Sequence, residues 1–102
     1  MKKIAILGCG QLGSRHLQAL KLVGTDLGIS VFDPNRDSLD VGKSRYEQFN
    51  GKNHIVQYCT EMFVDQDFDL VIVSCSANAR ADVITQFLNS NRTNYMVLEK
   101  LL

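Results

Sequence analysis

Cysteine is scarce in this 102-residue sequence, and proline occurs once, at position 34. The three cysteines, Cys9, Cys59 and Cys75, are odd in number, and no pair has Cys-x-x-Cys spacing. This pattern argues against a disulfide framework and against a structural zinc site. We therefore expect reduced thiols, as in a cytoplasmic protein, and no bound metal.

An excess of charge of either sign is also absent. Lys and Arg together number 11, and Asp and Glu together number 11, so the formal net charge is zero. A balanced chain has no general attraction for nucleic acid or for an anionic membrane, and we expect neither as a partner. Any anion must therefore be bound by local geometry rather than by the field of the whole protein.

Long apolar runs are missing as well. The first apolar run spans residues 4–7, whereas a signal peptide needs about 7–15 apolar residues and a transmembrane helix needs roughly 20. We therefore predict neither kind of segment. Apolar residues still make up 45% of the chain, which is typical of one soluble globular domain.

Short apolar runs alternate with stretches of helical periodicity. The apolar runs predict strands at residues 4–7, 29–33, 55–58, 69–74 and 95–98. The helical spacing predicts helices over residues 12–23 and 78–88, with a turn or a single helical turn at 60–65. It also predicts a helix that runs to about residue 49 and that Asp37 or Ser38 can cap. This alternation predicts an α/β fold, a Rossmann-type doubly wound parallel sheet with strand order 3-2-1-4-5.

The clearest functional motif is the glycine-rich stretch at residues 8–13, GCGQLG. It follows the first predicted strand and opens the first predicted helix, as a dinucleotide-binding turn requires. In such a turn Gly8 permits the sharp bend and Gly10 leaves room for a pyrophosphate. Gly13 lets the helix pack close to the strand.

The second part of the motif is Asp33, which lies 20 residues after the last of these glycines. Its carboxylate is placed to bind the hydroxyls of the adenosine ribose and to repel a 2′-phosphate, so we expect NAD rather than NADP. Arg36 would either cover the adenine or accept a 2′-phosphate. The first helix would direct the free N–H groups of Gln11 and Leu12 at the phosphates. We therefore predict that residues 1–102 form one dinucleotide-binding domain.

Simpler explanations of the same residues remain open. The glycines could only shape a turn, and Asp33 could only initiate the turn at Pro34. Proteins that bind S-adenosylmethionine or nucleotide sugars share related turns. The strand before the glycines, the helix after them and the correctly spaced acid together favour a dinucleotide.

The two ends of the sequence resemble one known family. Residues 8–17, GCGQLGSRHL, resemble the first turn of the glucose–fructose oxidoreductase, inositol dehydrogenase and rhizopine-catabolism (Gfo/Idh/MocA) family, whose members often carry an Arg-His pair after the third glycine. Residues 97–102, VLEKLL, are similar to the Glu-Lys-Pro motif that follows the fifth strand in that family. The resemblance covers the whole chain but only the N-terminal half of a typical member.

The resemblance implies an NAD(P)-dependent oxidoreductase that acts on a sugar, a cyclitol or a related hydroxyl compound. It also implies a C-terminal α/β domain that holds the small-molecule substrate and mediates oligomerisation. That substrate domain is absent from this chain, and a homo-oligomer is left open. Lys100 matches the family's lysine near the nicotinamide and the reacting hydroxyl, so it is the implied catalytic residue. Without the second domain we expect cofactor binding but no turnover.

The sequence departs from the family pattern in two places. Leu101 stands where the family usually has proline. Where members often read Thr-Pro-x-x-x-His after the fourth strand, Ser76 and Arg80 replace the proline and the histidine, and Asn78 fits a position that commonly contacts the cofactor. Together, the motif and the resemblance predict these cofactor contacts: Gly8, Gly10, Gln11, Leu12, Gly13, Asp33, Arg36, Ser74, Cys75, Asn78 and Glu99.

The remaining polar and sulfur side chains have structural explanations. His16 is expected to pack or to cap against the second domain, and His54 is expected at the surface. Cys9 supplies the small side chain that the glycine turn needs. Cys75 is expected to line the pocket beside the nicotinamide as a small residue at the strand end.

The sequence leaves three functions open. The first is the cofactor domain of a dehydrogenase. The second is a free-standing module that binds NAD(H) without catalysis of its own. The third is a purely structural domain with a vestigial glycine turn, which would bind no nucleotide.

Overall fold

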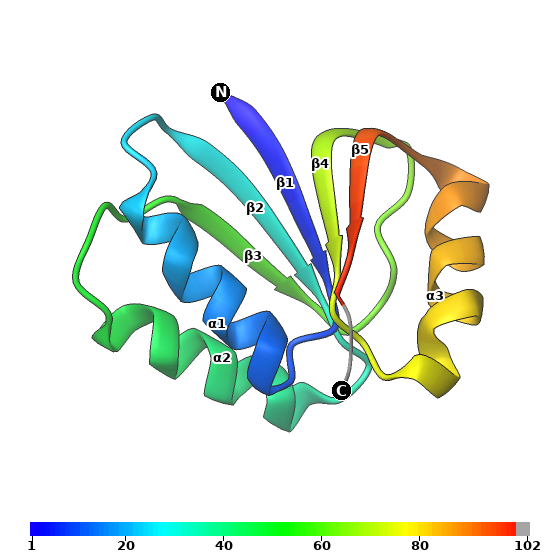
Figure 1. The fold of residues 1–102 in the computed structure, drawn as a ribbon, viewed down its shortest axis with the longest axis horizontal. Coiled ribbons are helices and arrows are strands. Elements are labelled where there is room, and N and C mark those ends of the chain that lie inside the picture. The colour runs from blue at the N-terminus through cyan, green and yellow to red at the C-terminus, as the bar shows by residue number, and fades with distance from the viewer. Residues whose placement is uncertain (100–102) are drawn as a thin grey trace.

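The computed structural model of the chain describes residues 1–99. Five parallel strands form one sheet in the order β3-β2-β1-β4-β5, and three α-helices of this described part pack against it (Figure 1). The elements are β1 (Lys2–Leu7), α1 (Gln11–Ala19), the 3-10 helix η1 (Leu20–Leu22), β2 (Leu27–Phe32), α2 (Arg36–Gln48), β3 (Ile55–Cys59), β4 (Gln66–Val73), α3 (Ala77–Ser90) and β5 (Asn91–Leu98). The predicted α/β class and strand order are confirmed.

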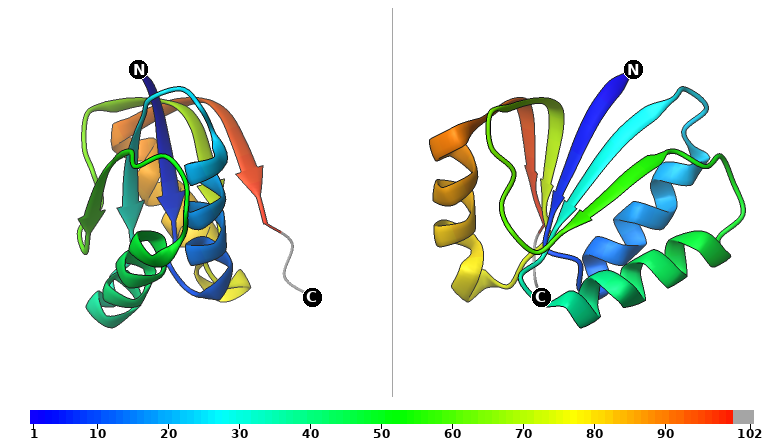
Figure 2. Two further views of the ribbon diagram at one scale, coloured as in Figure 1. Left: turned by 90° about the vertical axis from the view of Figure 1, so that its left-hand side faces the viewer. Right: turned by 180° about the vertical axis from the view of Figure 1, so that it is seen from behind.

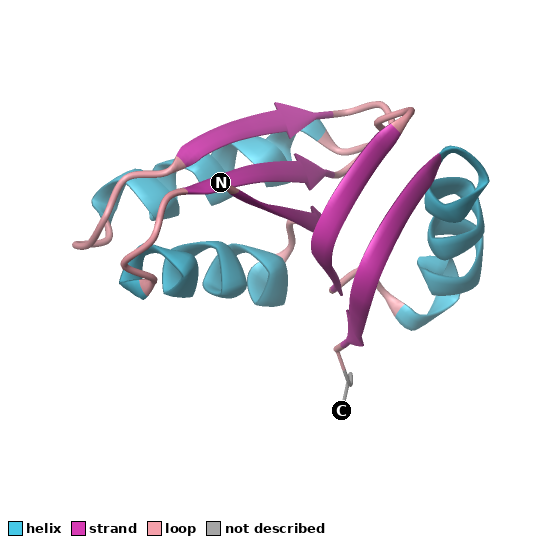
Figure 3. Cartoon of the chain, turned by 90° about the horizontal axis from the view of Figure 1, so that it is seen from above, coloured by secondary structure: helices cyan, strands magenta, loops and turns pink. Residues whose placement is uncertain are grey.

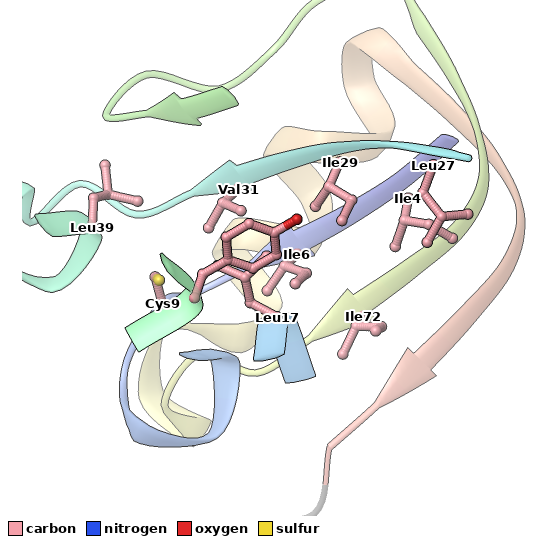
Figure 4. Packing of buried hydrophobic residues seen from close by; sticks show 10 residues of the cluster. Ile4, Ile6, Cys9, Leu17, Leu27, Ile29, Val31, Leu39 and Ile72 are labelled. Atoms are coloured by element: carbon pink, nitrogen blue, oxygen red, sulfur yellow. The ribbon is translucent and has the colours of Figure 1, made fainter. Parts of the chain in front are cut away.

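Helices cover both faces of the sheet. α1 and α2 lie on the face along β1, β2 and β3, whereas α3 lies on the opposite face along β4 and β5 (Figure 2). The uninterrupted apolar run of β1 packs on both faces of the sheet. Ile4 and Ile6 belong to the core on one face, and Ala5 and Leu7 belong to the core on the other. Figure 4 shows the first core, in which Leu17 of α1 packs against the sheet. A strand buried on both faces is therefore the reason for the continuous apolar pattern.

The strands β4 and β5 begin earlier than the apolar runs predict. They start at Gln66 and Asn91, and these two residues are partners in the sheet. The buried Asn91 side chain accepts from the Gln66 N–H at 3.1 Å and donates to the Phe63 carbonyl at 2.7 Å. Backbone hydrogen bonds hold a strand together whatever its side chains. Polar residues can therefore extend both strands, although the hydrophobic pattern gives no sign of it.

The start of α2 differs from the prediction. Asn35 is the N-cap, because its side-chain oxygen accepts from the N–H groups of Asp37 at 2.9 Å and Ser38 at 3.4 Å. The expectation that Asp37 or Ser38 caps this helix is therefore wrong. All three residue types are good caps, so local preference alone does not distinguish between them.

His54 is not the surface residue that the sequence suggests. It is partly buried, and its Nδ1 accepts from the Leu27 N–H at 3.2 Å. Its Nε2 therefore carries the proton and donates to the Leu20 carbonyl at 2.8 Å. The ring thus joins the start of β2 to η1.

The three cysteine side chains are buried or half-buried. Cys9, Cys59 and Cys75 are all free. Among residues 1–99, no group of three or more His, Cys, Asp or Glu side chains is arranged to hold a metal ion. In the same part of the chain, no helix is long and apolar enough to cross a membrane.

Cys9 packs tightly against α2, which confirms its expected packing role. Burial raises the pKa of its thiol to about 11, and the neighbouring Asp33 carboxylate adds to the rise. A Cβ atom at Gly42 would overlap Sγ of Cys9. Gly42 is therefore what allows α2 to approach the glycine turn this closely.

Replacing Gly42 by alanine is expected to destabilise the protein by about 1 kcal/mol. Alanine improves helix propensity by about 1 kcal/mol, but overpacking a tight core contact costs about 1–3 kcal/mol, and the overlap with Sγ is severe. Urea denaturation would measure the change. Adding Cys9→Ala removes the overlapping atom, so the double variant should be more stable than the sum of the two single effects. A Gly42→Ala variant as stable as the natural chain would contradict this account.

Candidate functional site

The carboxyl ends of the strands meet along one edge of the sheet. After β1 the chain turns to α1 on one face, and after β4 it turns to α3 on the other face (Figure 3). Neighbouring strands whose connections leave toward opposite faces have a crevice between their ends, and this is where ligands bind in such sheets. The glycine turn and the end of β4 therefore border a candidate site.

Two glycines of the turn are required by close approach. Gly8 has a φ of 99°, a conformation that residues with a side chain rarely adopt. A Cβ there would also lie 2.6 Å from the backbone nitrogen of Cys75. At Gly13 a Cβ would overlap the Gly8 carbonyl oxygen and lie 2.9 Å from Oγ of Ser74. Gly8 thus permits the bend and Gly13 permits the close approach of α1 to the turn, as the motif predicts. In addition, both glycines leave room for Ser74 and Cys75, which follow β4.

Gly10 is different, because the space beside it is open. Among residues 1–99, no heavy atom other than those of its chain neighbours lies within 4 Å of the position that a Cβ would take. Gly10 is also the N-cap of α1, and no side chain caps this helix or places an acid in its first turn. The first-turn N–H groups, including those of Gln11 and Leu12, therefore start an uncapped helix that borders open space. Such a helix start attracts phosphate groups.

Ser74 and Cys75, the two residues that follow β4, contact the glycine turn. The Ser74 hydroxyl is buried and donates to the Gly8 carbonyl at 2.7 Å, and the Ser74 N–H donates to the Leu7 carbonyl at 2.9 Å. Cys75 is half-buried against Gly8, and burial raises the pKa of its thiol. Ser74 was expected to contact the cofactor, but its hydroxyl is directed at the turn's backbone.

Asp33 connects the end of β2 to the glycine turn. Its Oδ2 accepts from the Cys9 N–H at 2.8 Å, and its Oδ1 accepts from the Asn35 N–H at 2.8 Å. The carboxylate is only half-buried, and each oxygen retains a lone pair for another donor. Asp33 therefore initiates the turn at Pro34 and also lies beside the phosphate-binding loop, so its two suggested roles do not exclude each other.

At the other end of the edge, Glu99 is held by three elements. Its N–H donates to the Val73 carbonyl of β4 at 2.9 Å, and its own carbonyl accepts from the guanidinium of Arg80 on α3. Its Oε2 lies 3.0 Å from Nε2 of His16 on α1. His16 thus packs within this domain, against the strand end. Lys100, the implied catalytic residue, lies outside the described residues.

Comparison with known proteins now adds to the geometry. Residues 2–100 match Gfo/Idh/MocA, described as an oxidoreductase family with an NAD-binding Rossmann fold. The chain belongs to this family. The resemblance inferred from its two ends is therefore confirmed, and the chain forms the NAD-binding Rossmann domain of this oxidoreductase family.

A solved structure supports the fold of this Gfo/Idh/MocA domain. It is described as "Substrate-directed dual catalysis of dicarbonyl compounds by diketoreductase", with a TM-score of 0.73 and 22% sequence identity. The match covers 100% of this chain and 43% of that chain. The chain therefore spans less than half the length of this structural neighbour. No curated protein sequence matches the chain.

Both ends of the site fit the cofactor of this family. At the glycine turn, the open space beside Gly10 and the uncapped α1 suit a pyrophosphate. At the β5 end, Nε of Arg80 is buried without a hydrogen-bond partner among residues 1–99. A buried donor without a partner is rare in proteins, and a ligand acceptor beside it would satisfy it.

Arg45 lies near the site, and no sequence motif points to it. Its guanidinium donates to Oγ of Ser14 at 2.8 Å, which joins α2 to α1 just behind the glycine turn. Together these helices border a cavity of about 380 Å³ that also includes Gly10 and Gln11. The only signal would have been a basic residue on the second helix, and many such residues are simply exposed.

A second hollow lies on the α3 side of Asp33. It measures about 570 Å³ and extends from the end of β2 across the turn at residues 60–65 to α3. Pro34, Thr60, Met62 and Val83 are among the residues that line it. None of them was selected from the sequence, because their proximity depends on how β3 and α3 lie across the sheet. Arg36 and Asn78 are exposed at the starts of α2 and α3.

Proposed function

We propose that the chain is the cofactor domain of an NAD(H)-dependent oxidoreductase that acts on a sugar, a cyclitol or a related hydroxyl compound. The observation that carries this proposal is the open space at Gly10 before the uncapped start of α1. Its family membership supports the reaction type. The three free thiols fit a reducing compartment, so we place the protein in the cytoplasm.

The binding edge divides into an adenosine half and a nicotinamide half. The N–H groups of Gln11 and Leu12 would bind the pyrophosphate, and Asp33 would accept from the ribose hydroxyls of adenosine. The apolar hollow with Pro34 and Met62 is suited to the adenine ring. On this arrangement, Arg36 covers the adenine rather than binding a 2′-phosphate.

The nicotinamide half is formed by the ends of β4 and β5. Cys75, Asn78 and Glu99 lie at these strand ends. Ser74 would affect cofactor binding indirectly, because its hydroxyl holds the glycine turn by a hydrogen bond to the Gly8 carbonyl. The bound cofactor would accept or donate the hydride. Lys100 would move the proton of the reacting hydroxyl, a role that the family resemblance implies. Because a substrate domain is also required, we propose that the chain alone binds cofactor without turnover.

NADH is expected to bind at least about tenfold more tightly than NADPH. The Asp33 carboxylate attracts the hydroxyls of the ribose, whereas it repels a 2′-phosphate, and a tenfold ratio needs only about 1.4 kcal/mol. Calorimetry with NAD⁺, NADH, NADP⁺ and NADPH measures the ratio directly. Binding of none of the four would refute the proposed function.

The matched variant for this preference is Asp33→Asn. It keeps the size of the side chain but removes its charge, so the ratio of NADPH to NADH dissociation constants should fall toward one. Using the ratio cancels any general weakening that follows from the altered hydrogen bond to the Cys9 N–H. Tighter binding of NADPH than of NADH by the natural chain would overturn the expected preference.

A further inference from the structure

The contact between His16 and Glu99 joins two parts of the binding edge that are 83 residues apart in the sequence. α1 begins at the glycine turn, where the pyrophosphate would bind, and Glu99 follows β5 at the nicotinamide half. The backbone of Glu99 is already fixed by Val73 and by Arg80. Among residues 1–99, His16 supplies the contact that holds the carboxylate itself.

Within the described part of the chain, the Glu99 carboxylate is held at its Oε2 oxygen. Oε2 lies 3.0 Å from Nε2 of His16, and no donor from residues 1–99 occupies Oε1. The carboxamide and the ribose of a nicotinamide nucleotide both carry hydrogen-bond donors. A carboxylate whose second oxygen is free, at the end of β5, is suited to accept from one of them.

We infer that His16 is a positioning residue that acts on the nicotinamide half of the cofactor through Glu99. This inference rests on the proposed function. A free glutamate side chain loses conformational entropy when it is ordered. By holding Oε2, His16 removes part of that loss before the cofactor binds, and it directs Oε1 at the site.

The exposure of the pair separates this role from a purely structural one. The side chains of His16 and Glu99 are 31% and 28% exposed. Polar contacts between side chains that are this accessible to water contribute little to folding stability. Loss of the pair should therefore appear in nicotinamide binding rather than in the thermal midpoint of the protein.

The experiment compares two ligands that share the adenosine diphosphate half. NADH is titrated by the fluorescence of its reduced ring, and ADP-ribose, which lacks the nicotinamide, is titrated by calorimetry. His16→Ala should weaken NADH binding about fivefold, the scale of one partly exposed charged contact, and leave ADP-ribose binding unchanged. His16→Gln retains an N–H donor for the carboxylate and should restore most of the loss.

Two further variants complete the design. Glu99→Ala should cause a similar loss for NADH, and the double variant should bind no more weakly than Glu99→Ala alone, because His16 acts only through Glu99. Arg15→Ala is the matched control, since Arg15 is the exposed neighbour of His16 on α1 and should bind both ligands as the natural chain does.

Each other result is decisive. Unchanged NADH binding by His16→Ala would overturn the inference, and so would an equal loss for both ligands or additive effects in the double variant. If the natural chain binds ADP-ribose but these variants behave in one of those ways, the proposed function stands and the inference alone fails. If the natural chain binds neither ligand, the proposed function fails and this inference fails with it.

Discussion

A Gly10→Val variant is expected to lose NADH affinity by about a hundredfold or more and to keep its fold. Among residues 1–99, no heavy atom beyond the chain neighbours of Gly10 lies within 4 Å of a Cβ built there, so the added Cβ finds open space in the fold. The valine side chain would occupy the volume that the pyrophosphate needs, and a hundredfold loss corresponds to about 2.7 kcal/mol of binding. The backbone of Gly10, with φ −73° and ψ −156°, is extended and open to valine.

Calorimetry with NADH and thermal unfolding of the same sample test both halves of this expectation. Gly10→Ala provides a graded control, because its smaller side chain should weaken binding less than valine. A Gly10→Val variant that binds NADH as tightly as the natural chain would show that the cofactor does not approach this turn.

Gly13→Ala is expected to have the opposite outcome, a loss of stability of about 3 kcal/mol. A Cβ at Gly13 would overlap the Gly8 carbonyl oxygen, which is backbone and has no flexible end to move aside. Overpacking typically costs about 1–3 kcal/mol and occasionally more. An overlap with backbone belongs to the costliest cases, about 4 kcal/mol, of which the helix propensity of alanine returns only about 1 kcal/mol. Because small domains are stable by about 5–15 kcal/mol, the loss is a large share of the total.

Urea denaturation measures this loss, with Gly24→Ala as the matched control. Gly24 has no heavy atom within 4 Å of its Cβ position and no positive φ, so the same substitution there should change the free energy of unfolding little. Equal stability of Gly13→Ala and the natural chain would mean that α1 does not pack against the turn as closely as the structure has it.

The order of the strands was predictable because each signal is local. The apolar run of β1, the glycines that follow it and Asp33 at the end of β2 are all read within short windows of sequence. Right-handed connections then leave few arrangements of a parallel sheet. The predicted cofactor contacts at the glycine turn share this local basis.

Contacts between distant residues could not be predicted in the same way. Gly42 lies in the middle of a helix, where glycine usually weakens the element, and only its approach to Cys9 explains it. The pairing of His16 with Glu99 depends on where β5 ends relative to α1. For this reason His16 was expected to contact a second domain, whereas in the structure it contacts Glu99 at the end of β5.

The hydrogen bond from the Cys9 N–H to Asp33 has a consequence for protein engineering. Cofactor preference is commonly altered by exchanging the acid at the end of the second strand. In this protein the same carboxylate anchors the loop that would bind the phosphates, so an exchange of Asp33 alone for a residue without a side-chain acceptor leaves a backbone donor of that loop unpaired. A redesign toward a phosphorylated ribose must therefore supply a new acceptor for the Cys9 N–H together with the basic group that recognises the phosphate. Selectivity and loop geometry would have to be changed in a single step.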